Sequence, residues 1–174
     1  MASDSNKDTL TYEIEFRKLG RTGWIKLKDK LEKSRFEWDT NTVEDARYEV
    51  RVIADDEKSN TPQTALTGSR ISDAFVIDNT APKIAKENIK IVKDVVRFTL
   101  TIQDAFTVIG NLSYTVDSNE DWISMLPDDL IYDTTTEDFT IQIEDMETGK
   151  HVIAVKISDD IKNVAYKTYE VNIK

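Results

Sequence analysis

The chain has 174 residues, of which 39% are apolar, enough for one large domain or two small ones, because domains usually contain ~100–150 residues. With 33 acidic against 23 basic side chains its net charge is −10, which argues against nucleic acid or an anionic membrane as partner, since both require a basic surface. The sequence has no cysteine, which excludes disulfides and thiolate sites, and its longest uncharged run, Ala105–Val116, is too short to insert into a membrane.

The N-terminal residues 1–8, MASDSNKD, lack the apolar core of a signal peptide, and we predict that they are disordered or an artificial addition. From Leu10 onward, apolar residues recur at every second position, the pattern of half-buried strands. Such sets begin at Leu10, Tyr48, Ile71, Val96, Leu112, Phe139, His151 and Tyr169. Only Lys26–Lys33 has helical spacing, over one turn at most. The sequence therefore predicts an all-β protein built of antiparallel β-sandwiches.

An internal repeat divides the chain. The 25 residues Phe36–Asn60 align without a gap with Phe139–Asn163, so that Tyr48 matches His151 and Asp56 matches Asp159. Upstream of these segments, LTYEIEF and LSYTVDS both precede a Trp-Ile pair, which aligns Tyr12 with Tyr114. We predict two tandem β-sandwich domains from this duplication.

The boundaries follow from the repeat. Each copy ends in one more strand, which is Ile71–Ile77 in the first copy, so the turn cluster after it is an interdomain linker that Pro82 stiffens. We predict a first domain at 9–78, a linker at 79–82 and a second domain at 83–174. Two strands at the start of the second copy, Ile84–Val92 and Val95–Ile102, have no match in the first. We expect the first domain to lack its first strands for this reason.

The ordered series FEWDT, ARYEVRVIADD, FVIDNTAP, YTVDSNEDW, LPDDLIYDTTTEDF, GKHVIAV and SDDIKN resembles a known family. These are the tandem fibronectin type III/immunoglobulin-like modules at the C-terminal end of large exported bacterial proteins, often behind a β-propeller. The chain departs from the family pattern at Leu130 and Lys162, and at Ala46 before the Tyr48 strand, where the family has glycine. Because those glycines supply positive φ, the turn types there are open.

The resemblance implies an extracytoplasmic location and a non-catalytic accessory role. The chain would act as a spacer or interaction module for an upstream domain of the same polypeptide. A carbohydrate- or cell-surface-binding module, with a protein or glycan as partner, is the alternative, and a calcium-stiffened adhesion-type domain pair is a further one.

Residues at equivalent repeat positions are expected to build the two cores. They are Trp24, Phe36, Trp38, Tyr48, Trp122, Phe139 and His151. For His151, the single histidine, a general base or metal ligand is the other interpretation, but no nucleophile motif such as G-x-S-x-G accompanies it. Adjacent acids such as Asp128-Asp129 point to opposite faces of a strand and cannot converge by themselves. We therefore expect no enzyme activity.

Exposed aromatic rings would favour sugar binding. Trp24 and Trp122 occupy equivalent positions, which favours a structural role, whereas Phe106 and Tyr132 lie in turn-like segments and are better candidates for exposed rings.

The acidic residues leave one cofactor open. No Lys or Arg occurs between Phe98 and Gly149, whereas twelve Asp and Glu do, and oxygen-rich loops suit Ca²⁺. The candidate ligands are Asp78, Asn79, Asp104, Asp159, Asp160 and Asn163. The alternative is that these side chains bond their own backbone in turns. No other cofactor is expected.

Overall fold

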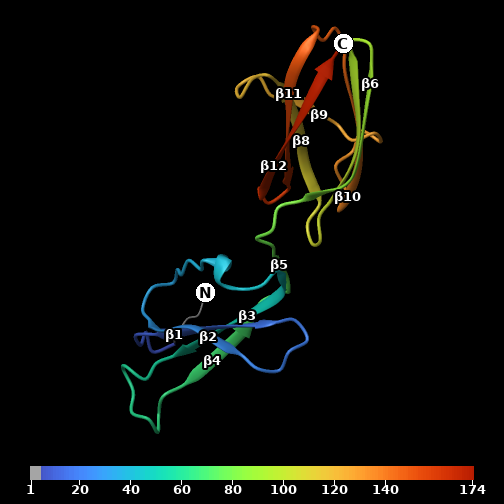
Figure 1. The fold of residues 1–174 in the computed structure, drawn as a ribbon. Helices are drawn as coiled ribbons and strands as arrows, with labels where there is room; N and C mark the ends of the chain where they lie inside the picture. Colours follow the sequence, from blue (N-terminus) through green and yellow to red (C-terminus); the bar gives the residue numbers. More distant parts are fainter. Residues whose placement is uncertain (1–4) are drawn as a thin grey trace. The chain divides into compact units, whose positions relative to one another are not determined.

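The computed structural model describes residues 5–174, which form two compact units, with the division between Asn79 and Thr80 (Figure 1). The described chain is built of antiparallel strands, with one short 3₁₀ turn at Thr40–Thr42. The all-β prediction is confirmed. Of the predicted N-terminal segment, residues 1–4 lie outside the described residues. Each unit is described by itself below.

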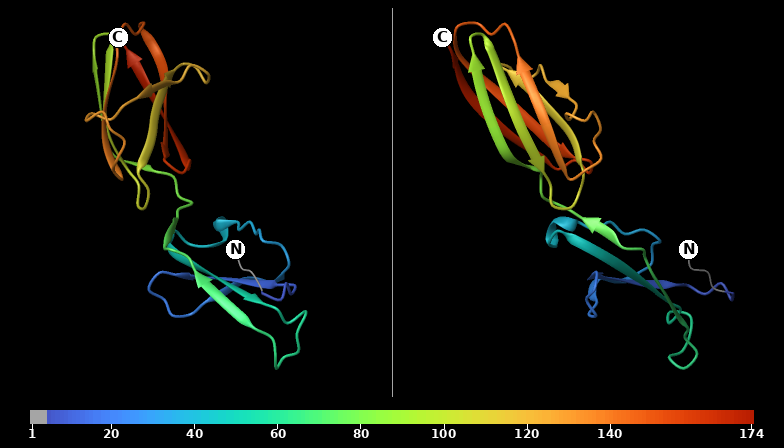
Figure 2. Two further views of the ribbon diagram at one scale, coloured as in Figure 1. Left: turned by 180° about the vertical axis from the view of Figure 1, so that it is seen from behind. Right: turned by 90° about the vertical axis from the view of Figure 1, so that its right-hand side faces the viewer.

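The second unit is a two-layered sandwich, as both views of Figure 2 show. Its strands are β6 (Lys83–Val92), β7 (Val95–Gln103), β8 (Ile109–Val116), β9 (Ile123–Met125), β10 (Thr136–Ile143), β11 (Gly149–Asp159) and β12 (Val164–Ile173). One sheet has the order β10-β7-β6 and the other β12-β11-β8-β9. Two antiparallel sheets of this kind form the architecture of immunoglobulin-like and fibronectin type III sandwiches.

Alternation along the strands fills the space between these sheets. Phe98, Leu100 and Ile102 of β7 point inward, and so do Phe139 and Ile141 of β10, all without exposed surface. They meet Leu112, Ile153 and Val155 from the facing sheet, which are equally buried. The burial of these large apolar side chains is the main stabilising contribution to this unit.

The first unit is a single sheet. Its strands are β1 (Thr11–Lys18), β2 (Ile25–Leu31), β3 (Ala46–Asp55), β4 (Thr67–Ile71) and β5 (Phe75–Ile77). They have the order β2-β1-β3-β4, and β5 also pairs with β3. The segment between β2 and β3 arches over one face of this sheet (Figure 1). Under the arch, Phe16, Ala46, Tyr48 and Ile77 form a small buried cluster, against which Trp38 and Val43 pack.

The strand pairing corrects details of the repeat. When β3 is matched to β11 through Tyr48 and His151, Tyr12 pairs with Ala54 of β3, whereas Leu112 pairs with Ile157, the counterpart of Ala54. Tyr12 is therefore the counterpart of Leu112, and its alignment with Tyr114 was wrong by two residues. A shift of two leaves the same side chains on the same face, which is why the sequence pattern did not show it.

Two predicted elements also differ from the structure. The helix-like segment Lys26–Lys33 is largely strand β2, because it pairs with β1. The strand contains a bulge, in which Lys30 adopts a φ of 49°. The last strand of the first copy begins at Thr67 and is interrupted after Ile71, whereas its counterpart β12 is continuous.

Candidate functional site

Asp104 follows β7 and closes the loop to β8. Its Oδ1 accepts hydrogen bonds from the backbone N–H of Phe106 at 2.8 Å and of Thr107 at 2.9 Å. Its own N–H donates to the carbonyl of Thr135 at 2.8 Å. This buried side chain therefore holds its own loop in an Asx turn, as aspartate commonly does in turns.

Asp159 ends β11 and, like Asp104, accepts hydrogen bonds from the turn that follows it, here the turn to β12. It is fully buried, its Oδ1 accepts from the N–H of Asn163 at 2.7 Å, and its Oδ2 accepts from the Asn163 side-chain amide at 2.7 Å. The first unit repeats the device, because the buried carboxylate of Asp56 accepts from the N–H of Leu66 at 2.7 Å. The duplicated aspartate thus fixes the turn after the counterpart strand in both units.

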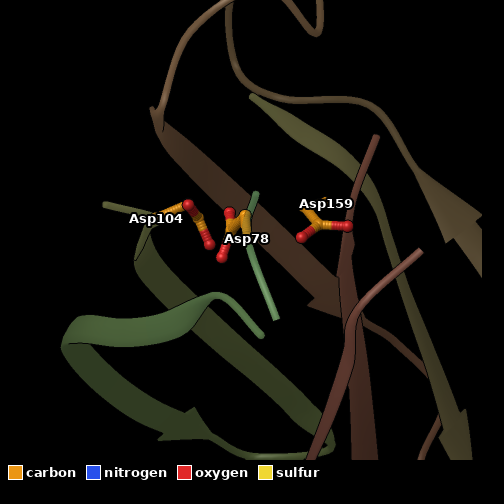
Figure 3. A group of neighbouring side chains, drawn as sticks. All are labelled: Asp78, Asp104 and Asp159. Carbon is orange, nitrogen blue, oxygen red and sulfur yellow. The ribbon is translucent and has the colours of Figure 1, made fainter. Parts of the chain in front are cut away.

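The two carboxylates of the second unit come together through a third side chain. The hydroxyl of Thr107 lies 3.3 Å from Asp104 Oδ1 and 3.2 Å from Asp159 Oδ2. One carboxylate oxygen of Asp104 lies within 4.8 Å of one of Asp159. Figure 3 draws both side chains, together with that of Asp78, which directly follows β5 and is also buried. Carboxylate oxygens in this arrangement are the ligand type that Ca²⁺ prefers.

The other predicted ligands have different surroundings. Asn79 is engaged within the first unit: its N–H donates to Asp45 at 2.7 Å and its side-chain amide to the carbonyl of Thr40 at 3.0 Å. Asp160 is exposed and does not belong to the group of neighbouring carboxylates that includes Asp104 and Asp159. Asn163 donates to Asp159 rather than presenting its oxygen to the same point.

His151 is half-buried on β11 and lies between two acceptors. Its Nδ1 is 2.6 Å from Asp117 Oδ2 and its Nε2 is 2.8 Å from the carbonyl of Glu147. The hydrogen bond to Asp117 raises the pKa of the imidazole, and the Glu147 carbonyl adds to this effect. The pKa of Asp117 is lowered, first by the N–H of Val152 and then by His151. The prediction of a core histidine was wrong, because the ring forms an ion pair outside the buried cluster.

Two of the three predicted core tryptophans, Trp24 and Trp122, lie on the outer faces of their sheets. The ring centre of Trp24 is 4.3 Å from the guanidinium carbon of Arg17 and 4.5 Å from that of Arg51. Both arginines neighbour inward-facing residues and so point to the outer face. Trp122 likewise contacts the exposed ring of Tyr166, and its indole N–H donates to the carbonyl of Asn119 at 3.0 Å. The core assignment of both residues was therefore wrong.

The remaining aromatic candidates divide by burial. Phe139 and Tyr48 lie in their cores, and Trp38 packs on the first-unit cluster. Phe36, predicted to be the first-unit counterpart of Phe139, is 37% exposed, so it is not a core residue. Tyr132, which was predicted to be an exposed ring, is half-buried. Its hydroxyl donates to the Met125 carbonyl at 2.5 Å and accepts from the Leu112 N–H at 2.9 Å.

The comparisons with known proteins add the following. No model of a known protein family matches the sequence, and no curated protein matches it. Among solved structures, the chain is similar to the crystal structure of the FN1–FN3 domains of chicken CNTN1, with 14% identity and a TM-score of 0.41. That match covers 96% of this chain, which spans only 56% of the length of the CNTN1 chain.

Sequence reasoning missed Thr107, the residue that joins the two carboxylates. The spacing Asp104-x-x-Thr107 directly after a strand was a usable signal, because Asp and Thr at this distance commonly share a turn.

No helix in the described part of the chain could span a membrane, since the only helical segment there is a three-residue turn.

Proposed function

We propose that the chain is a non-catalytic tandem module of a larger exported bacterial protein, in which it spaces or presents an upstream domain outside the cytoplasm. This proposal rests on the role of the buried polar residues in the second unit. Its buried acids, Asp104 and Asp159, accept hydrogen bonds from their own turns, and apolar side chains fill the space between its sheets. Such a unit is built to be a stable body that connects other parts.

A spacer requires that the connection between its units limit their motion. The linker contains Ala81-Pro82, in which the proline fixes its own φ and restricts the residue before it. We expect this pair to restrict the orientation of one unit relative to the other.

Double electron–electron resonance between two spin labels tests this directly. Because the chain has no cysteine of its own, labels attach only to cysteines that are introduced for the purpose. Exposed Glu57 and Lys150, one in each unit, would be replaced by cysteine and labelled. We expect a narrow distance distribution that broadens in a Pro82→Gly variant, with a Pro127→Gly variant as the control outside the linker. An equally broad distribution in the parent and in Pro82→Gly would reject the spacer function.

Calcium-dependent stiffening is the second candidate, and the closeness of Asp104 and Asp159 favours it. A cation that binds only the folded protein must raise its melting temperature. The label distances and the melt would therefore be measured with excess EDTA and then with millimolar calcium. A rise in melting temperature that Asp159→Asn abolishes and Asp160→Asn preserves would support calcium; no shift would reject it.

A carbohydrate-binding module remains the further alternative. Tyr166, which is 65% exposed, and its partner Trp122 offer the aromatic surface on the second unit. Their rings meet edge to face at 65°, whereas a sugar platform needs an open ring face. Glycan binding that is lost in Tyr166→Ala would favour this alternative over a spacer.

A further inference from the structure

The loop between β9 and β10 presents a patch of exposed apolar side chains. Leu126 is 56% exposed, Leu130 is 68% exposed and Ile131 is 58% exposed, and we call these three residues the apolar tip. The N–H of Leu130 donates to the carbonyl of Pro127 at 2.9 Å, which closes a β-turn. Because Leu126 and Ile131 flank this turn on either side, the three residues belong to one small surface. Exposed apolar side chains that gather in this way mark contact sites more often than scattered ones do.

The exposure of the apolar tip does not come from a loose loop. Pro127 is buried and Tyr132 is half-buried, so the loop is anchored on both sides of the turn. Between these anchors, the N–H of Asp128 donates to the carbonyl of Asp138 at 2.8 Å, and its carboxylate accepts from the N–H of Thr140 at 2.8 Å. The loop therefore holds the tip in one shape, and a partner that binds the tip does not have to order it first.

The same contacts decide how a partner can bind at this place. β10 is an edge strand, and the unpaired backbone groups of an edge strand invite a strand from another chain. Asp128 already engages the carbonyl of Asp138 and the N–H of Thr140 on that edge. Strand addition is blocked there, so a partner must bind through the side chains of the tip.

The backbone of Leu130 is unusual for a leucine. Its φ of 72° lies in the left-handed region, which is unfavourable for a residue with a Cβ. The other described non-glycine residues with positive φ are all lysine or aspartate. Burial does not offset this cost, because most of the Leu130 side chain is exposed. An unfavourable conformation that brings no packing within the chain is typical of a residue that contacts another molecule.

Charge around the tip narrows the chemistry of the partner. Asp128, Asp129 and Asp133 belong to the same loop, and all three are exposed. No Lys or Arg occurs from Phe98 to Gly149, the stretch that contains this loop and the two strands that it contacts, β8 and β10. A cationic surface is attracted to such a site, whereas an anionic lipid or a nucleic acid is repelled. Two tips from two copies of this chain would bring acids against acids, which disfavours self-association here.

We propose that the apolar tip binds a basic partner protein, on a surface where apolar side chains are flanked by Lys or Arg. Leu130 inserts between the apolar side chains of the partner, and Asp129 and Asp133 pair with its cations. In such an interface the buried apolar contact provides most of the affinity, while the charges orient the partner and speed its association. The inference goes beyond the spacer function, because it gives the second unit a binding surface of its own.

The test uses the whole chain and, as the probe, a synthetic peptide in which leucine and lysine alternate. We expect saturable binding by calorimetry at physiological salt, with NMR shift changes centred on residues 126–133. Leu130→Gly should weaken binding by about tenfold or more. The same variant should unfold at higher urea, because glycine suits the left-handed conformation, so its loss of binding cannot come from unfolding.

Leu66→Gly is the matched control. Leu66 is also 68% exposed and lies in a loop of the first unit, so its removal should leave binding of the probe unchanged. Equal weakening in Leu130→Gly and Leu66→Gly, or no binding of the probe at all, would overturn the proposal.

Two further peptides separate the apolar contact from the charge. One has serine in place of every leucine, and the other has glutamate in place of every lysine. Each should bind at least about tenfold more weakly than the probe. Equal binding of the serine-lysine peptide would reveal general attraction to an acidic chain and would contradict the proposed site. Concentration-dependent dimers that Leu130→Gly abolishes would replace the basic partner with a second copy. The spin-label distances do not depend on the tip, so a failure here leaves the spacer function standing.

Discussion

His151 and Asp117 make the stability of the second unit depend on pH near neutrality. The folded-state pKa of the histidine is raised by its hydrogen bond to Asp117, above the value of about 6.5 expected for an unfolded chain. The pair therefore stabilises the folded state fully below pH ~6.5, and this contribution is lost as the pH rises through the folded pKa.

Because the chain has a single histidine, its titration can be followed by NMR without assignment. We expect a midpoint above 6.5 that returns toward that value in Asp117→Asn. We also expect the melting temperature to fall between pH 6 and 8 in the parent but not in His151→Gln. A histidine that titrates at or below 6.5 would show that the ion pair does not form in solution.

Seven described residues other than glycine have a positive φ, a backbone conformation that suits glycine better, and two of them bear on the predicted turns. Leu130 has a φ of 72° and Lys162 a φ of 80°, and both stand where the family that the sequence resembles has glycine. The left-handed conformation costs a residue with a Cβ about 1–2 kcal/mol. The sequence left the turn types open at these positions, and the structure shows that the turns keep the glycine conformation.

We therefore predict that Lys162→Gly stabilises the second unit, by about 1 kcal/mol once the greater freedom of glycine in the unfolded chain is taken into account. Urea denaturation would show a higher midpoint with an unchanged slope. Lys150→Gly is the control, because Lys150 lies within strand β11, where glycine weakens the strand. A lower midpoint for Lys162→Gly would mean that the turn differs from the one described.

At the scale of elements, the loop between β9 and β10 depends on one hydroxyl. Tyr132 bridges the Met125 carbonyl and the Leu112 N–H, and its ring packs on Phe139. Burial raises the pKa of this phenol, so it remains neutral and able to donate at physiological pH.

Tyr132→Phe should keep the packing but leave both backbone groups without this partner, at a cost of about 1–3 kcal/mol. The free energy of unfolding of the second unit, measured in urea, checks this. Tyr166→Phe removes the hydroxyl of an exposed tyrosine and should have no measurable effect. Equal losses for the two variants would contradict the bridging role.

Sequence periodicity predicted most strands because alternation directly reflects burial on one face. The core assignment of Trp24 and Trp122 came instead from their equivalent positions in the repeat, and equivalence alone cannot show whether a side chain packs in a core or on an outer face. Periodicity also could not show that the Phe36 segment lacks a pairing partner, because hydrogen bonds between distant strands leave no local signal. The sequence predicted only that Asp104 and Asp159 lie in loops at the ends of a sandwich. It did not predict that the Thr107 hydroxyl lies between their two carboxylates.

At the scale of the whole molecule, the two units differ greatly in core size. The second unit buries a continuous cluster between two sheets, whereas the first buries a few residues beneath its arch. Because stability scales with buried apolar area, the first unit should be the less stable of the two.

We expect two unfolding transitions in urea, the first reported by Trp24 and Trp38 and the second by Trp122. A Trp122→Phe variant should remove only the later fluorescence change. A single transition in both variant and parent would show that the units unfold together.

One contact in the second unit would matter for the proposed spacer role. The chain enters this sandwich through β6 at one end and leaves through β12 at the other (Figures 1 and 2). Glu87 of β6 binds both Lys167 at 2.8 Å and Tyr169 at 2.7 Å on β12. Mechanical tension along the polypeptide would therefore pull these two strands in opposite directions along their length. Because β6 pairs with β7 and β12 pairs with β11, the two strands belong to different sheets, and the Glu87 contacts would resist that sliding by linking them directly.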